Sequence, residues 1–224
     1  MSKAQDLIKE DEQYFAKSGR IKYYPLAIDH GYGATLVDVD GKEYIDLLAS
    51  ASSQNVGHAP KKVTEAIKKQ VDKFVHYTPA YMYHEPLIRL SKKICDISPG
   101  DYEKRVTYGL SGSDANDGII KFARAYTGRP YIISFTNAYH GSTFGSLSMS
   151  AISLNMRKKY GPLLNGFYHI PFLDNYRGLF EQPTPNTVDE YLAPLKEMFN
   201  KYVPADEVAC IVLETIQGDG GLLE

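Results

Sequence analysis

The sequence has no tryptophan, only two cysteines and no long apolar run among its 224 residues. No stretch approaches the roughly 20 apolar residues that a transmembrane helix needs, and the N-terminus, MSKAQDLIKEDEQ, is too polar for a signal peptide. Cys95 and Cys210 lack the spacing of a disulfide framework or a metal site, so we expect buried, inert thiols. These absences favour a cytoplasmic protein without a bound metal.

The chain also lacks an excess of positive charge, since 25 Lys and Arg stand against 27 Asp and Glu, for a net charge of −2. No global field is available to attract nucleic acid or an anionic membrane, so any phosphate must be bound locally. The content of 43% hydrophobic and 23% charged residues is typical of a globular protein with a core of its own. Disordered, collagen-like and coiled-coil chains are excluded.

Hydrophobic periodicity predicts an α/β fold. A polar helix over residues 2–18 precedes a β-hairpin whose strands are joined by Asp40-Gly41, a dipeptide that tolerates positive φ. Beyond Pro60, helical patterns cover 63–74, 87–97, 114–126 and 188–202, and strand patterns cover 105–108, 131–135, 168–170 and 208–213. Because strands alternate with helices, we expect a mainly parallel sheet flanked by helices on both faces.

The loop 108–116, with the sequence YGLSGSDAN, lies between a predicted strand and a predicted helix. Amides at a helix start lack intrahelical partners, the helix dipole favours an anion there, and small residues let the backbone approach it. Ser111 or Ser113 can equally be a plain N-cap. The spacing fits neither a Walker loop nor a dinucleotide fingerprint, so a single phosphate is the expected ligand.

Two further loops follow predicted strands: 134–142, which contains Tyr139 and His140, and 214–221, which contains Glu214 and several glycines. The carboxyl ends of parallel strands meet at one edge of a sheet, which places these loops beside the phosphate loop. Tyr139 offers an aromatic face to a flat ring. Each loop taken alone is also explained as an ordinary turn, but three loops at strand ends favour a ligand site.

Together with Asn55-Val56-Gly57-His58 and the hairpin from Asp38 to Asp46, these loops resemble the class III, fold type I aminotransferases that use pyridoxal 5'-phosphate (PLP), a group that includes 4-aminobutyrate and ornithine aminotransferases. The resemblance spans nearly the whole chain. It implies a small-domain segment over residues 1–58 and the N-terminal portion of the PLP-binding large domain over 59–224. It also implies a homodimer that acts on an amino acid and a 2-oxo acid.

The resemblance assigns a role to several residues. In the family, the G-S-E-A-N-E loop holds the cofactor phosphate and the tyrosine of Y-H-G lies against the pyridine ring. The matching cofactor-binding residues are Gly112, Ser113, Tyr139, His140 and Glu214, with Glu214 expected near the ring. Both acids of the phosphate loop are Asp in this chain, which leaves the backbone and hydroxyl contacts unaffected.

Two substrate-side positions depart from the 4-aminobutyrate enzymes. Those enzymes often carry an arginine after Y-H-G to hold a distal carboxylate, where this chain has Ser142, and Asp219 is one methylene shorter than their gate glutamate. Residues 49–52 and 139–143 are similar to the branch that racemises or epimerises bulky apolar α-amino acids, such as isoleucine 2-epimerases. Transamination is the broader interpretation and epimerisation the alternative.

The family's Schiff-base lysine and the aspartate that pairs with the pyridine nitrogen both follow the last motif found here. We therefore expect an N-terminal part of such an enzyme that lacks the catalytic lysine and is inactive alone. Lys121 and Lys158 are expected to be solvated. A non-catalytic phosphate-binding or interaction fragment stays open as a third interpretation.

Overall fold

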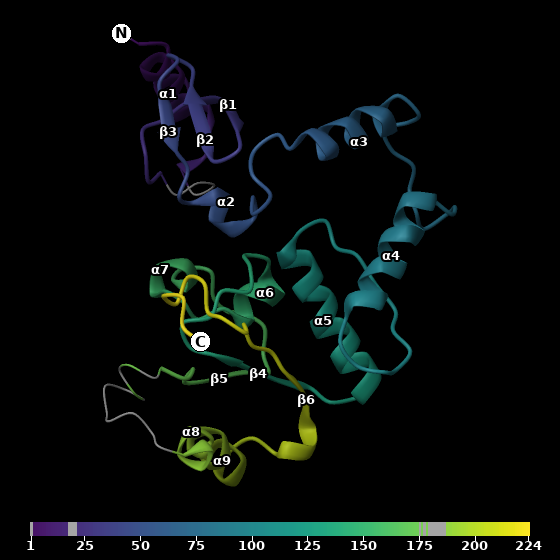
Figure 1. The fold of residues 1–224 in the computed structure, drawn as a ribbon. Coiled ribbons are helices and arrows are strands. Elements are labelled where there is room, and N and C mark those ends of the chain that lie inside the picture. The colour runs from purple at the N-terminus through teal and green to yellow at the C-terminus, as the bar shows by residue number, and fades with distance from the viewer. Residues whose placement is uncertain (1, 18–21, 175, 177, 179–186) are drawn as a thin grey trace. The chain divides into compact units, whose positions relative to one another are not determined.

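The computed structural model describes residues 2–17, 22–174, 176, 178 and 187–224, which form two compact units, Met1–Ile88 and Arg89–Glu224 (Figure 1). These two units are defined by contacts between residues of this chain. They do not test the domain boundary that we expect after His58, which therefore stays a prediction. Of the helices described, none combines the length and the apolar character that crossing a membrane requires.

The first unit contains an antiparallel sheet of β1 (Ile28–Tyr32), β2 (Thr35–Asp38) and β3 (Glu43–Ile45), in that order. The carboxylate of Asp38 accepts the amides of Asp40 at 3.0 Å and Lys42 at 2.8 Å, and Gly41 adopts a φ of 85°. These features close the turn at Asp40-Gly41 and confirm the predicted hairpin.

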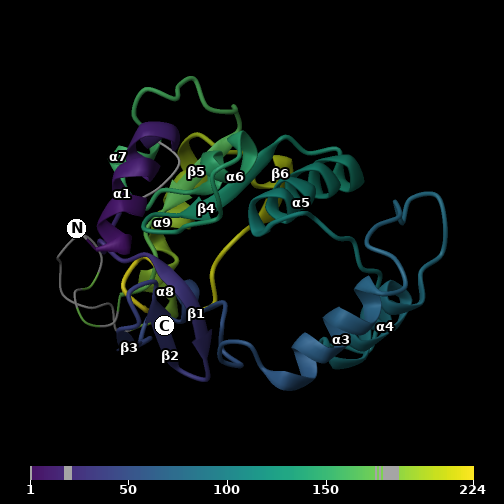
Figure 2. The same cartoon turned by 90° about the horizontal axis from the view of Figure 1, so that it is seen from above.

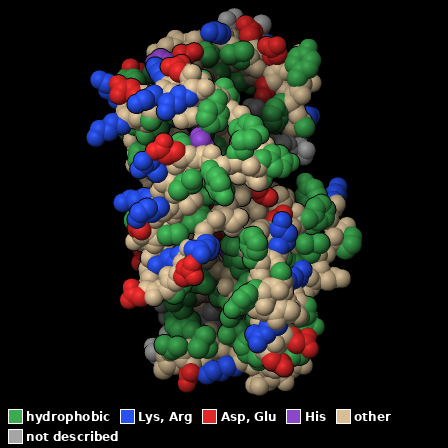
Figure 3. Space-filling view, turned by 90° about the vertical axis from the view of Figure 1, so that its right-hand side faces the viewer, with side chains coloured by type: hydrophobic (Ala, Val, Ile, Leu, Met, Phe, Trp, Pro, Cys, Tyr) green, Lys and Arg blue, Asp and Glu red, His purple; other side chains and the backbone are tan. Residues whose placement is uncertain are grey.

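The helices of this unit are α1 (Lys3–Tyr14), α2 (Ala49–Ser52), α3 (Lys61–Val71) and α4 (Glu85–Ile97), the last of which ends in the second unit. Three of them match the segments predicted at 2–18, 63–74 and 87–97, and the short helix α2 was not predicted. Ser2 and Gln5 form a capping box that starts α1. The apolar stripe of α3, made of Val63, Ile67 and Val71, is exposed. Hydrophobic side chains also gather between charged ones on the face drawn in Figure 3.

The second unit is built on a parallel sheet with the strand order β5-β4-β6. Its strands are β4 (Tyr131–Phe135), β5 (Phe167–Ile170) and β6 (Val208–Ile211). This arrangement confirms the predicted parallel sheet and three of its four predicted strands. β6 is shorter than expected, although the amide of Val212 still donates to the carbonyl of Ile133 at 2.8 Å.

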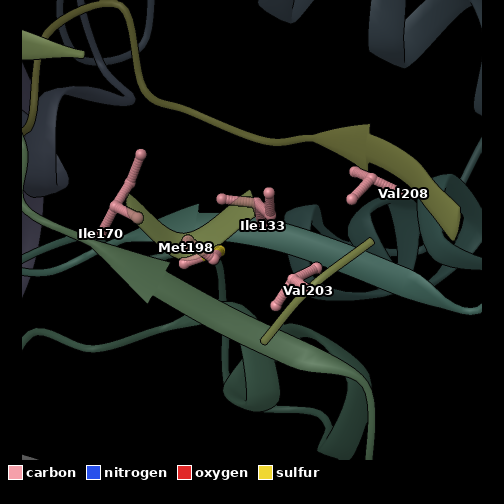
Figure 4. Close-up of a cluster of buried hydrophobic side chains, with 5 residues drawn as sticks. All are labelled: Ile133, Ile170, Met198, Val203 and Val208. Atoms are coloured by element: carbon pink, nitrogen blue, oxygen red, sulfur yellow. The ribbon is translucent and has the colours of Figure 1, made fainter. Parts of the chain in front are cut away.

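Helices cover both faces of this sheet (Figures 1 and 2). The helices of the unit are α5 (Gly112–Thr127), α6 (Phe144–Met149), α7 (Leu154–Arg157), α8 (Val188–Tyr191), α9 (Ala193–Lys201) and a short 3-10 helix (Ala205–Glu207). Successive side chains of a strand point to opposite faces. Ile132 accordingly packs with Ile120 and Met149 from α5 and α6. On the other face Figure 4 shows the cluster of Ile133, Ile170, Met198, Val203 and Val208.

The predicted strand at 105–108 is wrong, because these residues have no regular secondary structure. A strand exists only where a neighbour completes its hydrogen bonds, and no segment in the described ranges pairs with this one.

The single helix predicted over 188–202 is two helices, α8 and α9, that meet at Leu192. Pro194 lacks an amide donor and therefore fits only the first turn of a helix, where it stands in α9. The predicted capping box of Thr187 and Glu190 is present. Cys95 and Cys210 are half-buried rather than buried, and desolvation raises the pKa of the Cys210 thiol.

Candidate functional site

The start of α5 presents free amide donors. Ser111 is the N-cap: its Oγ accepts the amide of Asp114 at 3.2 Å, and Asp114 Oδ2 accepts the amide of Leu110 at 2.9 Å. The amides of Gly112 and Ser113 have no acceptor among the residues that the structure describes. A Cβ on Gly112 would meet nothing within 4 Å, so the approach to these donors is open. Ser111 is thus the cap, and the hydroxyl of Ser113 takes no part in capping.

The loop after β4 lies directly against this helix start. The amide of Ser142 donates to Ser113 Oγ at 3.1 Å. Gly141, with a φ of 129°, brings the two segments together, since a Cβ there would collide with the Ser113 side chain. Because Ser113 Oγ accepts from Ser142, its own hydroxyl proton is available to an anion.

Tyr139 is held at both ends. Its amide donates to Glu214 Oε1 at 2.8 Å, and its hydroxyl lies 3.2 Å from Ser142 Oγ. The residue is 37% exposed, so Tyr139 stays partly accessible from outside the chain. Through Ser142, the ring of Tyr139 is therefore a near neighbour of Ser113, as the sequence predicts.

His140 is buried beside this tyrosine with 7% of its surface exposed. Its amide donates to Ser150 Oγ at 2.8 Å and its carbonyl accepts Asn116 Nδ2 at 2.6 Å. Burial lowers the pKa of the imidazole, and the carboxylate of Glu214 opposes that shift only in part. His140 is thus a neutral side chain at neutral pH, and its Nε2 is buried with no partner among the described residues.

The loop after β6 joins the other two through Glu214 and Gln217. Glu214 Oε2 accepts the amide of Gly218 at 3.1 Å. Gln217 is fully buried and its Nε2 donates to the carbonyl of Thr136 at 2.9 Å. Asp219 is exposed in the turn that follows. The structure therefore unites all three predicted loops, with Asp219 at the exposed tip of the third.

Sequence reasoning missed the side chains that support these loops. Asp117 Oδ1 accepts the amide of Ser146 and the hydroxyl of Thr143, each at 2.8 Å, and so fixes the start of α6. Ser150, which follows the last residue of α6, accepts the amide of His140 through its Oγ. Asp117 carried a signal because it stands in the phosphate-loop motif, whereas nothing in the sequence distinguishes Ser150 from its neighbouring serines.

The family described as aminotransferase class-III matches residues 16–224. The chain belongs to this family. An isoleucine 2-epimerase of Lentilactobacillus buchneri is 53% identical over 224 residues, which are 100% of this chain and 50% of that protein. A leucine/methionine racemase of Thermococcus litoralis is 39% identical over 98% of this chain and 49% of its own length. The chain spans about half the length of the curated relatives it matches.

Solved structures of aminotransferases share the fold. A taurine:2-oxoglutarate aminotransferase from Bifidobacterium kashiwanohense, solved in complex with PLP and glutamate, superposes with a TM-score of 0.83 at 30% identity. The match covers 96% of this chain and 49% of that one. The predicted family and the predicted fold type I architecture are thereby confirmed.

Proposed function

We propose that this chain binds PLP, with the phosphate at the start of α5 and the ring beside Tyr139. The observation that carries the proposal is the hydrogen bond from the Ser142 amide to Ser113 Oγ, 3.1 Å long. It joins the two loops that hold the two chemically different ends of the cofactor. The taurine:2-oxoglutarate aminotransferase from Bifidobacterium kashiwanohense, which is 30% identical and was solved in complex with PLP, supports the same assignment.

The residues present fit such a group. The unpaired amides of Gly112 and Ser113 and the free proton of the Ser113 hydroxyl can donate to phosphate oxygens, and the dipole of α5 favours their charge. The partly exposed aromatic side chain of Tyr139 suits stacking against a flat aromatic ring. When bound, PLP withdraws electrons from the α-carbon of an attached amino acid. The chain's own residues bind and orient it, and the buried, neutral His140 adds no charge beside the ring.

Binding is tested with the 224-residue chain and two probes, inorganic phosphate and pyridoxine 5'-phosphate, which has no aldehyde to react with surface lysines. We expect calorimetry to show binding of both, with pyridoxine 5'-phosphate the tighter. Equal affinities for the two probes would contradict the ring site beside Tyr139. If neither probe binds, the whole proposal is wrong.

For the reaction, we propose racemisation or epimerisation of a bulky apolar α-amino acid. Ser142 places a hydroxyl, not a guanidinium, after Tyr-His-Gly, so this position offers no charge to a distal carboxylate. The identity of 53% to an isoleucine 2-epimerase supports this assignment. Removing and returning the α-proton needs no second substrate.

Transamination between an amino acid and a 2-oxo acid is the second candidate, supported by the 30% identity to an aminotransferase. The whole gene product, loaded with PLP and incubated with L-isoleucine, separates the two. Chiral chromatography should show the 2-epimer without any acceptor. A 2-oxo acid that forms only with an acceptor, and no epimer, would establish transamination instead.

We propose further that the Schiff-base lysine lies outside these residues. In support, Lys121 and Lys158 are exposed, and no lysine in the described ranges forms a hydrogen bond to the site residues. Borohydride reduction in the presence of PLP should therefore label no single lysine stoichiometrically. One stoichiometric adduct would contradict the proposal.

A homodimer in the cytoplasm is the setting we propose for the whole protein. Free Cys95 and Cys210 fit a reducing compartment. The exposed apolar stripe of α3 supports an association surface. Light scattering of the whole gene product should give twice the monomer mass, and a monomer would contradict the dimer.

A further inference from the structure

Glu214 uses both carboxylate oxygens on backbone amides of two different loops. Oε1 accepts from Tyr139 at 2.8 Å and Oε2 from Gly218 at 3.1 Å. A carboxylate that receives charge-assisted bonds in two directions is fixed in place and in turn fixes both donors. Glu214 stands just after β6 and Tyr139 just after β4, so the side chain connects the ends of two neighbouring strands.

The position of Tyr139 depends on this contact. Two nearby amides are bound elsewhere: that of Asn137, two residues earlier, to the carbonyl of Ala151 at 3.1 Å, and that of His140, the next residue, to Ser150 Oγ at 2.8 Å. Glu214 is the acceptor for the amide of Tyr139 itself within the described ranges. Tyr139 is 37% exposed, so packing against the chain holds the residue only in part, and its hydroxyl lies 3.2 Å from Ser142 Oγ.

We propose that Glu214 is a positioning residue that sets the ring of Tyr139 for stacking, and that it acts through the Tyr139 amide rather than by touching the cofactor. The proposal rests on the PLP site described above. In it, Glu214 influences the cofactor ring through the Tyr139 amide that it binds, and not by direct contact. It also ties the Gly218 end of the third loop to the ring, because one carboxylate holds both.

The test replaces Glu214 by Gln, which retains the size but leaves one acceptor oxygen and turns an NH₂ donor toward the other amide. We expect E214Q to weaken pyridoxine 5'-phosphate binding about fivefold, the scale of an aromatic stacking contact, with inorganic phosphate binding unchanged. Tyr139→Leu should weaken pyridoxine 5'-phosphate binding similarly. In the Y139L background, E214Q should have no further effect, because its route to the ring is gone.

The matched control is Asp38→Asn in the hairpin of the first unit. Asp38 likewise accepts two backbone amides, those of Asp40 and Lys42, and both belong to its own hairpin rather than to the three loops of the site. D38N should leave both affinities unchanged, which separates positioning from a general loss of stability. Equal weakening by D38N and E214Q would overturn the proposal.

A readout without any ligand is the hydrogen exchange of the Tyr139 amide, followed by NMR. Protection in the wild type that is lost in E214Q supports the proposal, and unchanged protection overturns it, even if neither probe binds and the PLP site itself fails. Weakening by E214Q that persists in the Y139L background would show direct contact of Glu214 with the ligand and would also overturn the proposal.

Discussion

The hydroxyl of Ser113 can accept one hydrogen bond and donate another. Its oxygen accepts the amide of Ser142 at 3.1 Å, which leaves its proton for the phosphate that we propose at the start of α5. A serine elsewhere in the same turn would not do this, since Ser111 is spent on the amide of Asp114. The partner that each hydroxyl oxygen accepts therefore decides which serine caps the helix and which one keeps a proton to donate.

Ser113→Ala removes the hydroxyl donor and the acceptor of the Ser142 amide. We expect affinity for inorganic phosphate to fall about tenfold, the scale of one hydrogen bond to a charged group. Calorimetry measures this, with Ser153→Ala as control, because Ser153 is the N-cap of α7 and has no part in the site. Wild-type affinity in S113A would contradict the role of this hydroxyl.

Gly141→Ala tests the close approach of the second loop to α5. An added Cβ would collide with the Ser113 side chain at a φ of 129° that alanine adopts only with strain. Gly221→Ala is the matched control, since Gly221 has a φ of 121° and open space around it. Urea denaturation should show a loss of more than about 2 kcal/mol for G141A and a smaller loss for G221A. Equal losses would mean that the approach is not tight.

At the scale of elements, β4 determines where the site forms. It is the middle strand of the parallel sheet, paired with β5 and β6, and its loop carries Tyr139 and Ser142. Its neighbour β6 ends at the loop with Glu214. The register between these two strands brings Tyr139 and Glu214 within hydrogen-bond distance, which neither loop could achieve by itself.

Ile133→Ala should therefore be costly. The side chain is fully buried in the cluster drawn in Figure 4, and its removal should lower the free energy of unfolding by about 2–5 kcal/mol. Ile45→Ala on the exposed side of β3 is the control, with 78% of its surface exposed and an expected change within about 0.5 kcal/mol. Urea denaturation compares them, and similar values would show that β4 is not central to stability.

At the scale of the whole molecule, buried histidines make stability depend on pH. Burial lowers the pKa of His140, and burial together with the Arg157 charge lowers the pKa of His169. Below the ordinary histidine pKa of about 6.5, the unfolded chain binds protons that the folded chain does not. The free energy of unfolding therefore falls as the pH decreases through this range.

We expect a fall of at most about 1.4 kcal/mol per pH unit for each of these histidines. Urea denaturation between about pH 7 and about pH 5 measures the slope. His169→Gln removes one proton-binding group and should flatten it. An unchanged slope in both H169Q and H140Q would contradict the assignment to these side chains.

Much of the fold and of the site could be predicted because the signals are local. The Asp40-Gly41 turn, the capping box at Thr187 and the helix over 112–127 follow from neighbouring residues. The strand predicted at 105–108 failed because a strand requires a partner, which periodicity does not report. The break at Leu192 was missed because the apolar positions continue across it.

The sequence by itself determined the family, through its motifs, and three of the parallel strands, through the periodicity of adjacent side chains. The residues that we propose to face an anion and a ring stay a prediction. Only the tertiary structure decided that Glu214 binds the amide of Tyr139, that Ser113 receives Ser142 and that His140 is buried and neutral. These outcomes depend on contacts between segments far apart in the chain, which the packing of β4 and β6 creates.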